Sequence, residues 1–475
     1  MQARMKFNRT AQNYLAIRKG LNRPNSAGTT QTGNFTRRLL ALIPFLALGH
    51  VLIFTNLLGS SVIDVDPSQG NVSLDPAPNL GNRLFWPGLF ALTLILVIRH
   101  RSRLRWDFFR SPAMAGLIAY LLLAGASVAW AFSPQHTISR YVLQIMLVTT
   151  VVLPYAVETP NKDTLKRLFN WYVLAIAINA VWLMFEKPML TEAGTIFGYR
   201  GFFGFKGYLG ECASLAILSC LYVLRSTTWQ RVLALFVIAI SILIVFMSKS
   251  KGSLAFALVS PVLAGAMLLP IVRLRLPMNA ILGGFLGCWF LISKFSNDLI
   301  NKLSYDLYGD GTLTGRTTIW DFIQGEISRN PWFGWGFHSF WLVGPSAPSV
   351  TEAPYWVKHM TGSHSGYLDV KLDTGFFGYA LLIFFIMATI HAIGRVSRTD
   401  LFRAWILLSL ALFIILTNIL ETVWFNPDPL WIVFLLVAAD ATYHRGSTAE
   451  IFSTPKRRRS VSTYKLVRNQ ASLAR

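Results

Sequence analysis

Residues 232–247 read VLALFVIAISILIVFM, a run in which serine is the one polar residue. A helix needs roughly 20 mostly apolar residues to cross a bilayer, so this run and its flanks predict a transmembrane helix. Similar runs recur along the whole chain and together predict about 12 such helices. Their approximate bounds are 39–58, 85–98, 112–131, 141–157, 168–186, 208–224, 232–247, 253–272, 279–293, 372–393, 404–420 and 430–443.

The composition supports this interpretation. The 475-residue chain is 53% hydrophobic and only 14% charged, whereas about 25% of the residues of a soluble protein are charged. The high hydrophobicity also excludes a disordered protein. A net charge of +22 suits either nucleic acid or a membrane surface. The apolar runs favour the membrane, so we expect no nucleic-acid partner. The three cysteines lie in apolar runs and are interpreted as packing residues.

The distribution of basic residues predicts the topology. If both termini are cytoplasmic, the loops on the inner side carry most of the Lys and Arg residues, as the positive-inside rule requires. The first apolar run is too long for a signal-peptide core, so we interpret it as an uncleaved span. We expect a multi-pass protein of a bacterial inner membrane. The predicted regions are a basic cytoplasmic tail (1–38), spans one to nine (39–293), a large periplasmic catalytic loop (294–371), spans ten to twelve (372–443) and a second basic cytoplasmic tail (444–475).

The large loop differs from the other connections because it is long and rich in aromatic and histidine residues. Long loops in compact proteins are usually functional. Trp320 and Trp335 could belong to an interfacial aromatic belt or could form a platform for sugar rings. The loop also contains His338, His359 and His364. We expect it to be a small, partly helical unit outside the membrane.

Four motifs occur in order within and just after this loop. They are Gly315-Arg316-x-x-x-Trp320, Asn330-Pro331-x-x-Gly334-x-Gly336-x-x-x-Phe340, His364-Ser365-x-x-Leu368 and Gly375-x-x-Gly378. This ordered set resembles the signature region of the O-antigen ligase and Wzy-type polysaccharide polymerase superfamily. The longer form around His364 looks most like the exopolysaccharide polymerases of the succinoglycan type. Two positions depart from the family pattern: Ser365 replaces the usual Asn, and Lys251 stands where Arg is expected.

The resemblance implies an all-α membrane glycosyltransferase whose donor sugar is carried on polyprenyl pyrophosphate. It favours a polymerase that joins lipid-linked repeat units in exopolysaccharide biosynthesis. A ligase that transfers glycan to a lipid A core would use the same chemistry and is the first alternative. A transporter or flippase for lipid-linked sugars is the second, although such a protein would carry internal symmetry and charges near the bilayer midplane. The resemblance also implies partners, which are a flippase, a chain-length co-polymerase and export proteins, besides membrane lipid.

The residues themselves suggest how such a reaction could proceed. Histidine, with an unperturbed pKa near 6.5, suits a general base, and His364 lies where the loop meets the membrane. Arg316, Lys251 and Lys249 are cations on the outer side that could stabilise a departing pyrophosphate. Arg316 could instead pair with Asp321, and the lysines could be interfacial anchors. We recognise no clear cluster of metal ligands in the outer loops, so we predict a reaction without metal or other cofactor.

A second group of residues precedes the sixth span. Arg200 and Lys206 bracket a glycine- and aromatic-rich stretch, and Glu211 follows just inside the span. The cations could contact phosphate, or the stretch could be a re-entrant loop with interfacial aromatics. An ionisable residue such as Glu211 within a span is a functional hypothesis by default. Asp369 could orient His364 or could form a salt bridge with Lys371.

Overall fold

The computed structural model describes residues 27–55, 80–157, 164–190, 196–274, 276–278, 280–284, 315–354 and 356–453. Within these ranges the chain is helical apart from connecting loops, and one short antiparallel hairpin joins β1 (Met189–Leu190) to β2 (Ile196–Gly198). The protein is an all-α polytopic membrane protein, as its sequence predicted.

Among the described residues, 7 helices are long and apolar enough to cross a membrane. They are α2 (Ala27–Gly49) with its continuation η1 (His50–Phe54), α6 (Pro112–Ala126) with η3 (Ser127–Ala129), α7 (Pro134–Ala156), α10 (Thr228–Ser248), α11 (Lys251–Arg273), α16 (Gly366–Val396) and α17 (Leu401–Leu420). A further apolar stretch of helix, Pro429–His444, lies within α18 (Pro429–Ser453).

Three other long helices occupy predicted spans but are not among the helices that are long and apolar enough to cross a membrane. They are α4 (Leu80–Arg99), α8 (Thr164–Leu183) and α9 (Lys206–Val223). Helix α9 is buried on nearly all sides, with its glutamate, serines and cysteines packed inside the bundle. Helices that contact other helices rather than lipid can carry such small and polar residues. Every predicted span therefore coincides with a helix except the ninth, 279–293, most of which lies outside the described residues.

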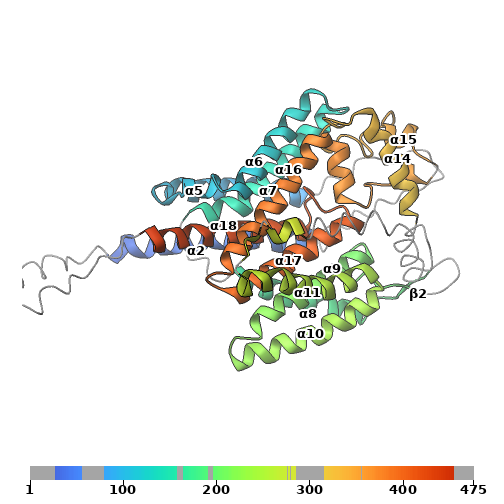
Figure 1. Ribbon diagram of the computed structural model, residues 1–475. Coiled ribbons are helices and arrows are strands. Elements are labelled where there is room, and N and C mark those ends of the chain that lie inside the picture. Colours follow the sequence, from blue (N-terminus) through green and yellow to red (C-terminus); the bar gives the residue numbers. More distant parts are fainter. Residues whose placement is uncertain are drawn as a thin grey trace, which may run out of the picture.

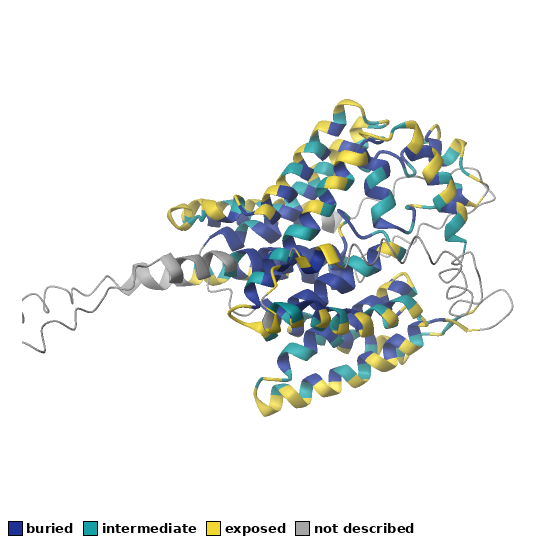
Figure 2. Cartoon of the chain, viewed as in Figure 1, coloured by how far each residue is buried: buried dark blue, intermediate teal, exposed yellow. Residues whose placement is uncertain are grey.

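The helices pack side by side into one bundle (Figure 1). Helix α9 contacts α8, α10, α11 and α17, while α16 contacts α6, α17 and α18. The centre of the bundle, which includes α17 and the apolar part of α18, is buried (Figure 2). Helix α10 instead exposes large apolar side chains such as Leu235, Phe236, Leu243 and Phe246. A contiguous apolar face of this kind suits lipid contact.

The unit that we expect to lie outside the membrane, called the extramembrane unit below, is at one end of the bundle, where α16 begins (Figure 1). It contains α14 (Arg316–Arg329), α15 (Pro348–Thr351) and η4 (Val357–His359). Ile319, Ile323 and Ile327 recur along one face of α14 and pack with Phe340 and Leu372 in a small apolar core of their own. This period of four residues is that of an amphipathic helix, which explains why α14 folds against the beginning of α16.

A break in α16 joins this unit to the bundle. Gly375 has φ 65° and ψ −162° inside the helix, and the carbonyl groups before it are freed from the helical ladder. The backbone N–H of Trp335 donates to the carbonyl of Leu372 at 2.9 Å, and that of Gly336 donates to the carbonyl of Asp373 at 2.9 Å. Buried backbone groups require partners, so the turn at residues 330–336 completes the hydrogen bonding of the broken helix.

We expect Gly375→Ala to destabilise this junction. Its backbone conformation is almost exclusive to glycine, and an added Cβ would lie 2.2 Å from the carbonyl carbon of Trp332. Strain of this kind costs about 1–3 kcal/mol before any clash is counted. Thermal unfolding of the purified protein should show a lower midpoint.

The matched control for this prediction is Gly325→Ala in the middle of α14, where an added Cβ meets no atom within 4 Å. Alanine is the better helix former, so this control should unfold at the same temperature or higher. Equal midpoints for wild type and Gly375→Ala would show that the break does not depend on glycine.

Candidate active site

Two of the predicted residues, His364 and Arg316, converge on one carboxylate. The Nδ1 atom of His364 lies 3.4 Å from Oε2 of Glu421, and Nη2 of Arg316 donates to Oε1 of Glu421 at 2.8 Å. All three side chains are partly exposed, with side-chain exposures of 36% for His364, 26% for Glu421 and 17% for Arg316. The group is therefore accessible to a substrate, and the contacts with Glu421 hold His364 and Arg316 close to one another.

Each member of this group lies at the end of a helix. Arg316 is the first residue of α14 and follows Gly315, which caps the helix with φ 82°. His364 lies in the turn before α16 with φ 53°, and Glu421 ends α17. The backbone N–H of Gly366 donates to the carbonyl of Glu421 at 3.0 Å, which fixes the start of α16 against the end of α17. The side chains thus meet where α14 and α16 begin and α17 ends.

Asp369 stabilises the turn that carries His364. Its carboxylate accepts the backbone N–H of Ser363 at 3.1 Å and the indole N–H of Trp341 at 2.9 Å. It also accepts a hydrogen bond from the hydroxyl of Thr422, which neighbours Glu421. We expected Asp369 either to orient His364 or to form a salt bridge with Lys371. The contacts fit the orienting role, because Asp369 binds Ser363, which precedes His364, and Thr422, which follows Glu421.

Trp320 and Trp335 both use their indole N–H groups inside the extramembrane unit. Trp320 donates to the carbonyl of Ser363 at 3.0 Å and so supports the histidine turn directly. Trp335 donates to the carbonyl of Glu326 at 3.1 Å, and its ring packs against Phe340. Both rings are partly buried against the small core of this unit.

The lysine cations lie on two neighbouring elements. Lys249 ends α10 in a left-handed conformation (φ 52°), and its Nζ donates to the carbonyl of Ile196 at 2.8 Å. Lys206 donates to the carbonyl of Phe197 at 3.3 Å, so both lysines hold β2. Lys251 begins α11 on the exposed surface. The next residue, Gly252, faces Leu420, which precedes Glu421. The start of α11 is therefore close to the His364 group.

Arg200 pairs with Glu186. The carboxylate of Glu186 accepts the backbone N–H of Arg200 at 3.2 Å and that of Gly201 at 2.8 Å, and it lies 3.7 Å from Nε of Arg200. The side chain of Arg200 is half-exposed. Glu186 therefore fixes the turn before α9 in addition to pairing with the arginine.

A comparison with protein families now bears on this geometry. Residues 233–383 match the family model described as O-antigen ligase. These residues are therefore similar to the O-antigen ligase family, and they are called the O-antigen ligase domain below. The match confirms the resemblance predicted from the ordered motifs. No curated protein matches the chain.

The O-antigen ligase domain runs from α10 into α16 and so includes Lys249, Lys251, Arg316 and His364. Glu421 lies beyond it, on the helix that follows. Members of this family are glycosyl-transferring membrane enzymes, which gives the convergence of a histidine, an arginine and a carboxylate a chemical context.

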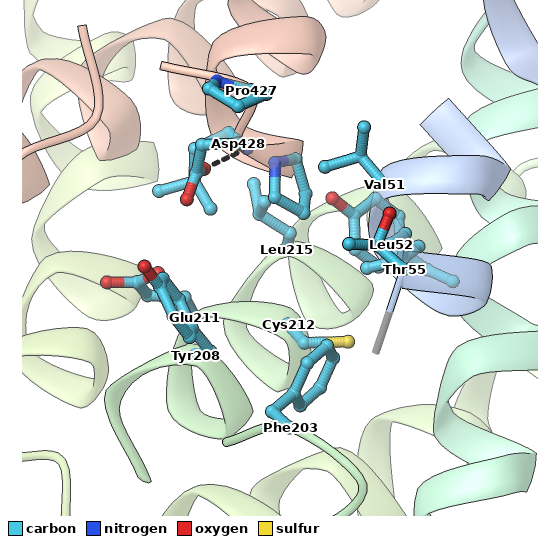
Figure 3. Close-up of a pocket in the computed structure, with 13 residues that line it drawn as sticks. Val51, Leu52, Thr55, Phe203, Tyr208, Glu211, Cys212, Leu215, Pro427 and Asp428 are labelled. Atoms are coloured by element: carbon cyan, nitrogen blue, oxygen red, sulfur yellow. Dashed lines mark hydrogen bonds between the residues drawn. The ribbon is translucent and has the colours of Figure 1, made fainter. Parts of the chain in front are cut away.

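Glu211, the acidic residue singled out beside the O-antigen ligase domain, is only 2% exposed. It lines a cavity of about 180 Å³ together with Asp428 and Tyr208 (Figure 3). Asp428 lies in the loop that follows Glu421 and accepts the backbone N–H of Leu430 at 2.7 Å, which caps α18. Within the described residues, Oε2 of Glu211 has no hydrogen-bond partner. A largely apolar cavity that contains two carboxyl groups is therefore lined in part by the loop that follows Glu421.

His338, an alternative base within the O-antigen ligase domain, has a different environment from His364. Its Nε2 lies 3.3 Å from the carbonyl of Phe425, and its backbone N–H donates to Asp373 at 3.0 Å. Burial and the nearby charge of Arg140 lower the pKa of His338 to about 4, although the hydrogen bond to Phe425 opposes the shift. The side chain is therefore neutral and structural at physiological pH.

This burial predicts an acid-sensitive stability. An unfolded histidine binds a proton near pH 6.5, whereas folded His338 does so near pH 4. The unfolded state binds more protons between these values, so the free energy of unfolding falls as the pH drops from about 6.5 towards 4. At pH 5 the loss from this group is about 2 kcal/mol. Thermal unfolding at pH 7 and pH 5 should show a smaller pH effect in His338→Asn than in wild type; equal effects would contradict this assignment.

Proposed function

We propose that the protein is a polysaccharide polymerase that joins polyprenyl-pyrophosphate-linked oligosaccharide repeat units in exopolysaccharide biosynthesis. The observation that carries this proposal is the convergence of His364 and Arg316 on Glu421 at the end of the bundle. In this proposal His364 is the base and Arg316 the cation, and both act at the membrane surface, where a lipid-linked donor would present its anomeric carbon and its pyrophosphate together.

In the proposed reaction the acceptor hydroxyl oxygen attacks the anomeric carbon of the donor sugar. The bond from that carbon to the phosphate oxygen breaks, and polyprenyl pyrophosphate leaves with the bonding electrons. His364 accepts the hydroxyl proton at Nε2, because Nδ1 faces Glu421 and is available to donate to it. Attack opposite the leaving group inverts the configuration at the sugar carbon.

Several features support binding of the pyrophosphate at this place. Arg316 has five N–H donors, and Nη2 is the one that contacts Glu421. Both Arg316 and Lys251 begin helices, whose N-terminal ends favour anions. Lys249, Lys206 and Arg200 are the outer cations of this binding surface. Trp320 and Trp335 are the aromatic residues that we propose to contact the sugar rings, and the indole of Trp320 supports the histidine turn.

The catalytic loop, 294–371, faces the periplasm of a bacterial inner membrane in this proposal, with both termini in the cytoplasm. The basic tails, 1–38 and 444–475, then lie next to anionic headgroups. A flippase would supply the lipid-linked substrate, and chain-length and export proteins would act on the product. A ligase that transfers glycan to a lipid A core remains the second candidate, because it would use the same base and cations and differ in its acceptor.

The charges of Arg316 and the lysines can serve the purpose for which other transferases use a divalent cation. We therefore propose a metal-independent reaction, in which an excess of EDTA leaves the rate unchanged.

The function can be tested with purified protein in lipid vesicles and a polyprenyl-pyrophosphate-linked repeat unit. A ladder of products on a gel, with or without EDTA, is expected for a polymerase. A single transfer that requires an added lipid A core would assign the protein as a ligase. Movement of intact substrate across the vesicle membrane without any new glycosidic bond would identify a transporter.

A further inference from the structure

A second cavity lies at the opposite end of the bundle from His364. It has a volume of about 360 Å³ and is bounded by the end of α11, the start of α17 and the residue Arg225 that follows α9. Helix α11 begins beside Glu421 and ends at Arg273, and α17 begins at Leu401 and ends beside Glu421. The cavity therefore lies towards the other end of these two helices from the candidate active site.

The lining combines two cations with an apolar floor. Arg225 and Arg273 supply the positive charge, and no acidic residue lines the cavity. The floor is formed by Gly265, Leu268, Leu269, Phe402 and Trp405. The exposed fraction of Leu269 is 50%, so the apolar floor opens to the outside of the bundle.

Two contacts fix the shape of this groove. The guanidinium of Arg225 lies 4.5 Å from the centre of the Phe402 ring, which holds its charge over the apolar floor. The indole N–H of Trp405 donates to the carbonyl of Pro261 at 2.8 Å and so orients the Trp405 ring. Gly265 lies beside Trp405, and an added Cβ there would make only an ordinary contact with the indole nitrogen at 3.7 Å, so the backbone at this position leaves room for a side chain.

We propose that this groove binds an anionic phospholipid, such as phosphatidylglycerol, with its phosphate between Arg225 and Arg273 and an acyl chain along Leu268, Leu269 and Trp405. Basic pockets between transmembrane helices on the cytoplasmic side bind anionic headgroups. Charge complementarity favours an anion over a zwitterionic lipid, and the opening beside exposed apolar residues suits an occupant that lies in the bilayer. The distance from His364 favours a bulk phospholipid over the polyprenyl carrier of the proposed reaction.

Photolabelling tests this proposal without relying on glycosyl transfer. The full-length protein is placed in vesicles that contain a photoactivatable phosphatidylglycerol, and the labelled peptides are identified by mass spectrometry. We expect labels at the end of α11 and the start of α17. Unlabelled phosphatidylglycerol should compete, whereas phosphatidylcholine and polyprenyl phosphate should not. The double variant Arg225→Gln/Arg273→Gln should reduce labelling at least fivefold.

Two further variants separate specific binding from misfolding and from general charge effects. Gly265→Leu keeps both arginines and fills the groove, so it should reduce labelling as strongly as the double variant. Arg398→Gln removes an exposed arginine between α16 and α17 and should leave labelling unchanged. Labelling outside the groove, or equal competition by phosphatidylcholine, would overturn the proposal. Stronger competition by polyprenyl phosphate would assign the groove to the carrier instead and would also overturn it.

Discussion

Replacing His364 with alanine is expected to lower the rate of glycosyl transfer by at least about a hundredfold, because general base catalysis by a positioned side chain contributes about 10²–10⁴-fold. The imidazole is the partly exposed base of the group and has Glu421 on its Nδ1 side. The rate is measured as glycosidic bonds formed by purified protein in vesicles that contain the lipid-linked donor and acceptor.

The control for this variant is His359→Ala, which removes another histidine of the same extramembrane unit, from η4. It should retain most of the activity. Both variants should unfold at the wild-type temperature, since the contacts that hold the turn are made by Ser363 and Asp369 rather than by the imidazole. Full activity in His364→Ala would remove the base from the mechanism, whatever the family of the protein.

Arg316→Ala is expected to have a comparable effect through a different step. Removal of one preorganised group that stabilises developing charge costs about 10²–10³-fold in rate. The departing pyrophosphate gains negative charge as its bond to the sugar breaks, so the loss should appear mainly in kcat. Arg316→Lys keeps the charge but not the planar fork and should recover part of the activity.

Arg329 provides the matched control, because it ends the same helix that Arg316 begins. Its guanidinium is half-exposed and pairs with Glu352 and Glu326. Arg329→Ala should leave the rate within a few-fold of wild type. If Arg316→Ala were as mild, its ion pair with Glu421 would be a structural contact and the pyrophosphate would require another partner.

The helices were the most predictable part of the fold, since a long apolar run has few alternatives in a bilayer. The beginning of α16 is a place where hydropathy alone gave the wrong helix start. Asp369 and Lys371 lower the local hydropathy, so the span was predicted to begin at 372, whereas the helix begins at Gly366. Asp369 is accommodated by hydrogen bonds from Trp341 and Thr422, which lie in other segments of the chain. Hydropathy along one segment carries no information about such partners.

The same limit applies to the candidate site. The motifs around Arg316 and His364 indicated both residues, but Glu421 lies 105 residues from Arg316 and was not singled out. One signal was present: Glu421 directly follows the predicted span 404–420, and ionisable residues at such places are often functional. Its pairing with both residues depends on how α14, α16 and α17 meet. Likewise, the contacts of Lys249 and Lys206 with β2 depend on a hairpin too short to be predicted from its sequence.

The most direct test of the central claim is the release of polyprenyl pyrophosphate by the purified protein. Released carrier and newly formed glycosidic bonds are counted together for wild type and His364→Ala, with EDTA present. The account predicts one carrier released for each bond formed by wild type, and neither product above background from the variant. Release without bond formation, or equal release by the variant, would contradict glycosyl transfer at the group formed by His364, Arg316 and Glu421.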